Sequence, residues 1–166
     1  MYIVLCGMMG CGKTTVARAL EDRLGWQRVD TDEWIVGHHG DISAIFSEKG
    51  EAYFRGLETE AVRALPCGED IIVSVGGGLV LKEENVRLLK AQGKIVYLQA
   101  SKQTLQQRLE GDTTRPLLAG EALSARLDGL LSVRSAIYEK VADATICVDE
   151  KTPAEIADEI VQKFGL

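Results

Sequence analysis

The sequence lacks several features that define whole classes of protein. Its four cysteines form no C-x-x-C pair and no spacing typical of a metal site. Lysine and arginine number 19 against 25 acidic residues, and the net charge of -6 argues against a nucleic-acid or anionic-membrane surface. The N-terminal apolar run, residues 2–6, is too short for a signal peptide or a membrane span. We therefore expect a cytoplasmic protein with reduced cysteines. Cys6 and Cys147 lie in apolar runs, so we expect both to be buried thiols.

Internal repeats, low-complexity segments and linkers are also missing, so we expect one domain over residues 1–166. Apolar runs typical of buried strands occur at residues 3–6, 27–29, 71–75, 95–98 and 144–148. Helical spacing occurs between them, at residues 15–24, 51–65, 83–91, 103–109, 121–141 and 153–164, the last with Thr152 as its cap. This alternation predicts an α/β fold with a parallel sheet covered on both faces.

Residues 7–14, GMMGCGKT, match the G-x-x-x-x-G-K-[ST] phosphate loop between an expected strand and an expected helix. The glycines allow successive backbone N–H groups to converge on phosphate oxygens. Lys13 offers a positive charge to the β- and γ-phosphates, and the Thr14 hydroxyl is a hard oxygen ligand for Mg²⁺. A glycine-rich turn can also bind nothing, but the full motif in this setting predicts a nucleoside triphosphate site.

Polar residues and glycines follow the second and third expected strands, where ligands of a parallel sheet bind. Of Asp30 and Asp32, one can hold Mg²⁺ while the other accepts a hydrogen bond, and then a proton, from an acceptor alcohol. The alternative for Asp32 is the N-cap of a short helical turn over residues 33–36, and the two roles are compatible. Three glycines at residues 76–78 indicate a bend, a flexible connector or, as we favour, a ligand pressed against the main chain.

Three arginines are notable in this acidic chain. Arg55 precedes Glu58 by three residues, so Glu58 could orient its guanidinium. Arg134 lies one helical turn before Tyr138. An arginine on a helix is often only solvated, which leaves the roles of these two open. Arg115 lies in the aperiodic segment 111–120, which we expect to be a mobile loop, and a cation there can close over a triphosphate.

Together these motifs resemble shikimate kinase from the first expected strand to the last helix. The resemblance rests on residues 10–15, 30–32, 54–58, 76–78 and 115–118, and on Arg134 with Tyr138. It implies a P-loop kinase fold resembling nucleoside monophosphate kinases, with a five-stranded parallel sheet of order 2-3-1-4-5 flanked by helices. It also implies a substrate-binding region at about residues 32–60 and a mobile lid at about 111–120. The reaction implied is transfer of the ATP γ-phosphoryl group to the 3-hydroxyl of shikimate, on the route to aromatic amino acids.

The resemblance further implies a role for each motif residue. Those that bind ATP are Gly10, Cys11, Gly12, Lys13, Thr14, Thr15, Arg108, Arg115 and Pro153, with adenine between Arg108 and Pro153. Those that bind shikimate are Asp32, Arg55, Gly77, Gly78 and Arg134. Thr14 and Asp30 would hold Mg²⁺, while Lys13, Asp32 and Arg115 would act in catalysis. The resemblance favours a monomer whose partners are ATP and shikimate, with no nucleic acid or membrane.

Three other functions are compatible with parts of the sequence. A kinase for another acid, such as gluconate, would share the phosphate loop, but the arginine pair and triple glycine argue against it. A GTP-dependent switch would need an N-K-x-D element, yet the only asparagine, Asn85, precedes Val86. A pseudoenzyme that binds ATP without catalysis is disfavoured because no motif residue is missing. His38 and His39 match no motif, and we expect them at the surface.

Overall fold

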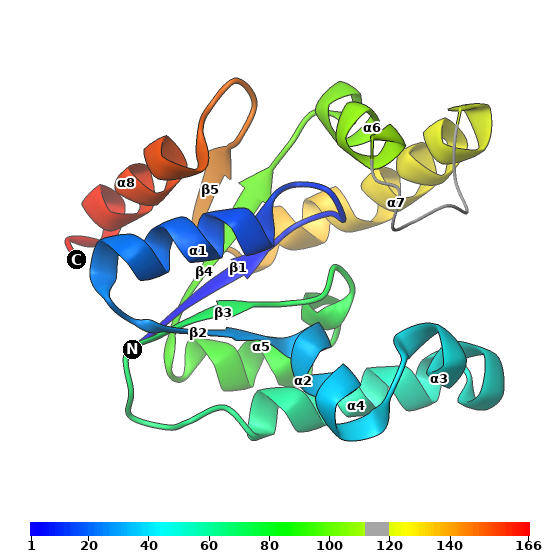
Figure 1. Cartoon of the computed structure of the whole chain (residues 1–166), viewed down its shortest axis with the longest axis horizontal. Coiled ribbons are helices and arrows are strands. Elements are labelled where there is room, and N and C mark those ends of the chain that lie inside the picture. The colour runs from blue at the N-terminus through cyan, green and yellow to red at the C-terminus, as the bar shows by residue number, and fades with distance from the viewer. Residues whose placement is uncertain (112–119) are drawn as a thin grey trace.

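Five parallel strands form one sheet in the order β2-β3-β1-β4-β5 in a computed structural model, which describes residues 1–111 and 120–166 (Figure 1). The strands are β1 (Tyr2–Cys6), β2 (Gln27–Asp30), β3 (Ile71–Ser74), β4 (Gly93–Gln99) and β5 (Ala144–Cys147). Each expected strand is present, and the order agrees with the one that the resemblance implied.

Burial along the strands follows their position in the sheet. Every residue of the central strand β1 is at most 3% exposed, because β3 and β4 pair with it on either side and helices cover the sheet. In the edge strand β5, Ile146 is buried whereas Cys147 is exposed. Our expectation that Cys147 is a buried thiol is therefore wrong, while Cys6 in β1 is buried as expected.

Eight α-helices and one 3₁₀ turn are described. They are α1 (Lys13–Leu24), α2 (Thr31–His39), α3 (Ile42–Lys49), α4 (Glu51–Arg63), η1 (Leu79–Leu81), α5 (Glu83–Lys90), α6 (Lys102–Glu110), α7 (Gly120–Val141) and α8 (Pro153–Phe164). Helices α1 and α8 pack against each other, and α5 and α7 each contact β4 (Figure 1). Six helices agree with the predicted ranges within two residues. In the described part of the chain, no helix has the length and apolarity to cross a bilayer.

Two helix starts bear on the site. The Thr152 hydroxyl accepts a hydrogen bond from the Glu155 amide, and the Glu155 carboxylate accepts one from the Thr152 amide, as in a capping box. At α2 the cap is Asp30, whose Oδ1 accepts from the amides of Asp32 and Glu33 at 2.9 and 3.2 Å. The suggestion that Asp32 is the cap is therefore wrong, because Asp32 lies inside the first turn of α2.

A second, smaller hydrophobic core lies beside the main one. The main core surrounds the sheet, while the second lies among α2, α3 and α4, the cyan helices of Figure 1. We call this second cluster the α2–α4 core; its buried members are Ile35, Ile45, Phe54, Leu57 and Ala61. Helix α3 was not predicted, and α2 was predicted only as a short turn over residues 33–36. Both are short, and they gain stability chiefly by packing on α4.

Candidate active site

A cavity of about 690 Å³ opens beyond the carboxyl ends of β1, β2 and β3. Every predicted site residue that the structure describes lines it: Gly10, Cys11, Gly12, Lys13, Thr14, Thr15, Asp30, Asp32, Arg55, Gly77, Gly78, Arg108, Arg134 and Pro153. Arg115 and residues 112–119 of the expected lid lie outside the described residues. The fold thus gathers, in one place, motifs that are spread over more than a hundred residues of sequence.

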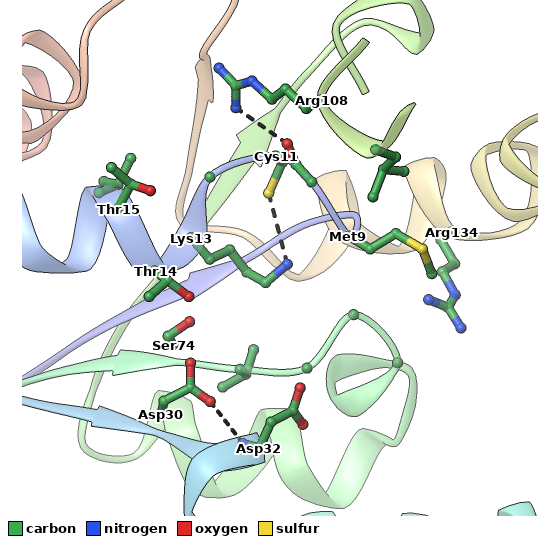
Figure 2. A pocket seen from close by; sticks show the side chains of 18 of the residues that line it. Met9, Cys11, Lys13, Thr14, Thr15, Asp30, Asp32, Ser74, Arg108 and Arg134 are labelled. Carbon is green, nitrogen blue, oxygen red and sulfur yellow. Dashed lines mark hydrogen bonds between the residues drawn. The ribbon is translucent and has the colours of Figure 1, made fainter. Parts of the chain in front are cut away.

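The phosphate loop has the backbone geometry that its glycines predict. Gly10 and Gly12 have φ values of 81° and 98°, in the left-handed region that glycine adopts without a steric penalty. The Lys13 ammonium donates to the carbonyl oxygens of Gly7 and Met8 at 2.9 and 3.0 Å. It also lies 3.9 Å from the Cys11 sulfur (Figure 2). Lys13 is therefore held against the loop, where α1 begins and where an anion is favoured.

Hard oxygen donors gather below the phosphate loop. Thr14, Ser74 and Asp30 point toward one another in Figure 2, from α1, β3 and β2. Asp30 and Ser74 are direct neighbours across paired strands. Asp30 uses Oδ1 for its cap, which leaves its second oxygen for a cation. Within residues 1–111 and 120–166 no three His, Cys, Asp or Glu side chains form a metal cluster. The donor set suits Mg²⁺, which takes few carboxylates and completes its shell with phosphate and water.

On the opposite side of the cavity, Arg55 is fixed by carboxylates of its own helix. Its Nη1 donates to Oε1 and Oε2 of Glu58 at 3.0 and 2.9 Å, and its Nη2 donates to Glu51 at 3.2 Å. This confirms the expectation that Glu58 orients Arg55. Burial raises the pKa of Glu58, whose residue is 1% exposed, and Arg55 opposes that rise.

The three glycines leave room for charged side chains. A β-carbon on Gly78 would overlap the Arg55 guanidinium, with only 2.5 Å to its Cζ. On Gly77 it would lie 3.1 Å from Nη1 of Arg134, and on Gly76 it would lie 3.1 Å from Asp32 Oδ1. None of the three glycines has a positive φ. Close approach of these side chains, rather than backbone freedom, therefore accounts for the triple glycine.

Arg134 reaches this glycine turn from α7 (Figure 2). One turn further along α7, the Tyr138 hydroxyl donates to the Gly77 carbonyl oxygen at 2.6 Å. At the other end of the cavity, Arg108 of α6 donates to the Gly10 carbonyl oxygen at 3.3 Å. Pro153, the first residue of α8, lines the same end. The cavity thus has the phosphate loop on one side and the two arginines on the other.

Known proteins resemble this chain over almost its whole length. A family model described as shikimate kinase matches residues 9–164. The chain belongs to the shikimate kinase family. Over 165 residues it is 40% identical to the shikimate kinase of Thermodesulfovibrio yellowstonii. The aligned region covers 98% of this chain and 94% of the relative. Members of this family are ATP-dependent kinases, so the chain is placed among phosphotransferases.

Solved structures extend the comparison. A shikimate kinase from Acinetobacter baumannii, in complex with shikimate, is 35% identical with a TM-score of 0.90, covering 98% of this chain and 92% of that one. A gluconokinase from Sinorhizobium meliloti is 20% identical with a TM-score of 0.71, covering 99% and 91%. The likeness to the gluconokinase shows a shared fold only, so it does not support gluconate as the acceptor of this chain.

Several residues that line the cavity are not predicted from the sequence. The polar ones are Ser74, Arg126 and Lys151, and the apolar ones include Met9, Ile42 and Phe46. Ser74 could have been found, because it is the polar last residue of a strand whose carboxyl end faces the site. Ile42 and Phe46 could not, because both belong to the unpredicted helix α3. Arg126 carries no local signal that separates it from a solvated helical arginine.

Proposed function

We propose that this chain transfers the γ-phosphoryl group of ATP to the 3-hydroxyl of shikimate, giving shikimate 3-phosphate and ADP. One observation carries the proposal: a single cavity has a phosphate loop on one side and, on the other, two arginines that approach a glycine turn from α4 and α7. Two guanidinium groups suit one planar carboxylate, because each can offer forked donors. The family and the shikimate complex of the Acinetobacter relative support the choice of acid.

On the nucleotide side, the loop amides and Lys13 would hold the triphosphate, with Gly10, Gly12, Thr14 and Thr15 around it. Lys13 would exchange two carbonyl oxygens for phosphate oxygens, a gain of charge-assisted hydrogen bonds. Cys11 would fill the floor of the loop, where it is 1% exposed. Adenine would lie between Arg108 and Pro153, since a planar guanidinium stacks well on a purine.

Mg²⁺ fits the oxygen donors near the loop. Thr14 would bind it directly and Asp30 directly or through water, with Ser74 as a further hydroxyl of the same corner. When bound, the cation supplies positive charge that offsets the charge developing on the phosphoryl oxygens.

On the acceptor side, Arg55 and Arg134 would hold the carboxylate, and the amides of Gly77 and Gly78 would contact the ring substituents. Asp32 would accept a hydrogen bond from the reacting hydroxyl and take its proton during attack on the γ-phosphorus. Phosphoryl transfer depends mainly on alignment and charge, so no protein nucleophile is required.

We further propose that residues 1–166 act as one domain and one monomer in the cytoplasm, with the substrate-binding region at about 32–60. A lid at about 111–120 would bring Arg115 to the phosphates and exclude water from the reaction. The α2–α4 core supports the substrate-binding assignment, because it gives that region a packed interior of its own.

An ADP-release assay tests the function directly. We expect rapid turnover with ATP, Mg²⁺ and shikimate, and only background rates with gluconate or with no acceptor. The phosphorylated position is read from the ³¹P–¹H coupling of the product. Equal rates with and without shikimate would argue for a nucleotide hydrolase or switch, and preference for gluconate would argue for the rival kinase.

A further inference from the structure

The carbonyl group of Gly77 is bound by Tyr138, to which the family resemblance assigns no role. The Tyr138 hydroxyl donates to this carbonyl oxygen at 2.6 Å. Tyr138 is fully buried and does not line the cavity. Its ring packs against Tyr97, with the ring centroids 5.0 Å apart. Tyr138 can therefore affect a bound acid only through the groups that it holds.

The same hydroxyl also meets Arg134. The positive charge of the nearby Arg134 guanidinium opposes the rise that burial causes in the pKa of Tyr138. A β-carbon on Gly77 would lie 3.1 Å from Nη1 of Arg134 and 3.4 Å from the Tyr138 hydroxyl oxygen. The hydroxyl donates its one hydrogen to the Gly77 carbonyl, so toward the nearby guanidinium its oxygen can act only as an acceptor.

We propose that Tyr138 is a positioning residue for the acceptor acid, because its hydroxyl sets the distance between the Gly77 backbone and the Arg134 guanidinium. The inference rests on the proposed function, in which both groups contact shikimate. Without the hydroxyl, the guanidinium would lose a polar neighbour and the turn would lose a donor. Shikimate would then bind to a Gly77 backbone and an Arg134 guanidinium that are less well ordered. The contacts of Lys13 and Thr14 with the nucleotide lie elsewhere in the cavity and would be unaffected.

Tyr138→Phe tests the proposal, because it removes the hydroxyl and keeps the ring. We expect the KM for shikimate to rise roughly threefold to tenfold, the effect of one net hydrogen bond. The KM for ATP and kcat should stay within about twofold, because the variant does not change the residues that would bind the nucleotide. Tyr97→Phe is the matched control, because Tyr97 is the buried packing partner, does not line the cavity and should leave both KM values unchanged.

A double-mutant cycle separates positioning from general stability. If Tyr138 acts through Arg134, adding Tyr138→Phe to Arg134→Lys should raise the KM for shikimate less than it does in the wild type. Additive effects, an unchanged shikimate KM, or equal rises in both KM values would each overturn the proposal. Wild-type protein that neither binds nor phosphorylates shikimate would instead overturn the proposed function, and this inference with it.

Discussion

Both oxygens of the Glu58 carboxylate accept hydrogen bonds from one nitrogen of Arg55, at 3.0 and 2.9 Å. The acid is buried, with 2% of its side chain exposed, whereas 26% of the Arg55 side chain is exposed. The carboxylate thus anchors the guanidinium from the protein side and leaves its outer edge toward the cavity. Burying a charge in this way costs stability unless the pairing is good, so the pair is better explained by binding than by folding.

Glu58→Gln should separate these two effects. We expect the KM for shikimate to rise about tenfold, because Arg55 loses its charged anchor. Burial raises the pKa of Glu58, so the folded state holds this proton more tightly than the unfolded state does. The wild-type free energy of unfolding should therefore fall, relative to the variant, as pH rises from near 4.5 through the folded pKa. Urea unfolding across pH 4 to 7 measures this difference. A wild type that gains stability over Glu58→Gln with rising pH would contradict it.

Asp32→Asn should keep nucleotide binding and lose most phosphoryl transfer. The amide still hydrogen-bonds but cannot accept a proton, and general base catalysis is worth roughly 10²–10⁴ in rate. Single-turnover ADP formation gives the rate, and titration with ATP checks the binding. Glu33→Gln, an exposed neighbour on α2, is the control for the lost charge. Turnover within threefold of wild type would mean that Asp32 only orients the alcohol or has no role.

Asp30→Asn should preserve α2 and weaken use of Mg²⁺. Asparagine caps a helix as well as aspartate does, so the hydrogen bonds to the amides of Asp32 and Glu33 can remain. The lost charge should raise the Mg²⁺ concentration for half-maximal rate by about tenfold. Asp41→Asn is the matched control, because Asp41 caps α3 at the Ala44 amide and does not line the cavity. An unchanged Mg²⁺ requirement would remove Asp30 from the site, and EDTA should abolish turnover in all three proteins.

Gly78→Ala should reduce affinity for the acid without changing the fold. The backbone of Gly78 has φ -96°, which alanine adopts freely, but the added methyl group would push the Arg55 guanidinium aside. We expect the KM for shikimate to rise at least tenfold, the cost of losing roughly one charge-assisted hydrogen bond. Gly56→Ala is a control, since a β-carbon there has no neighbour within 4 Å among the atoms described. Equal kinetics for Gly78→Ala and wild type would contradict the close approach.

The sequence was sufficient for the features that rest on local pattern. The phosphate loop, the five strands and the capped start of α8 depend on periodicity, glycine and capping residues that lie close together in the chain. The carboxyl-end rule for parallel sheets then placed Asp30, Asp32 and the glycines beside that loop. The strand order came only through family resemblance, because pairing between distant strands has no local signal.

Other features arise only in three dimensions. Helix α3 is eight residues long and is held by packing on α4, so its own propensity does not reveal it. Cys147 lies in an apolar run, yet an edge strand exposes alternate residues. Asp30 and Asp32 look alike in sequence, and only the backbone of α2 decides which one caps it. The reason for three glycines lies in Arg55, Arg134 and Asp32, which reach them from other helices.

The α2–α4 core shares no residue with the larger core around the sheet. Its side chains can therefore be varied without opening the interior that supports the phosphate loop. A protein built this way can exchange one alcohol for another over evolutionary time while its ATP chemistry stays intact. For laboratory evolution, random libraries confined to residues 34–61 would explore new acceptors at little risk to the nucleotide half.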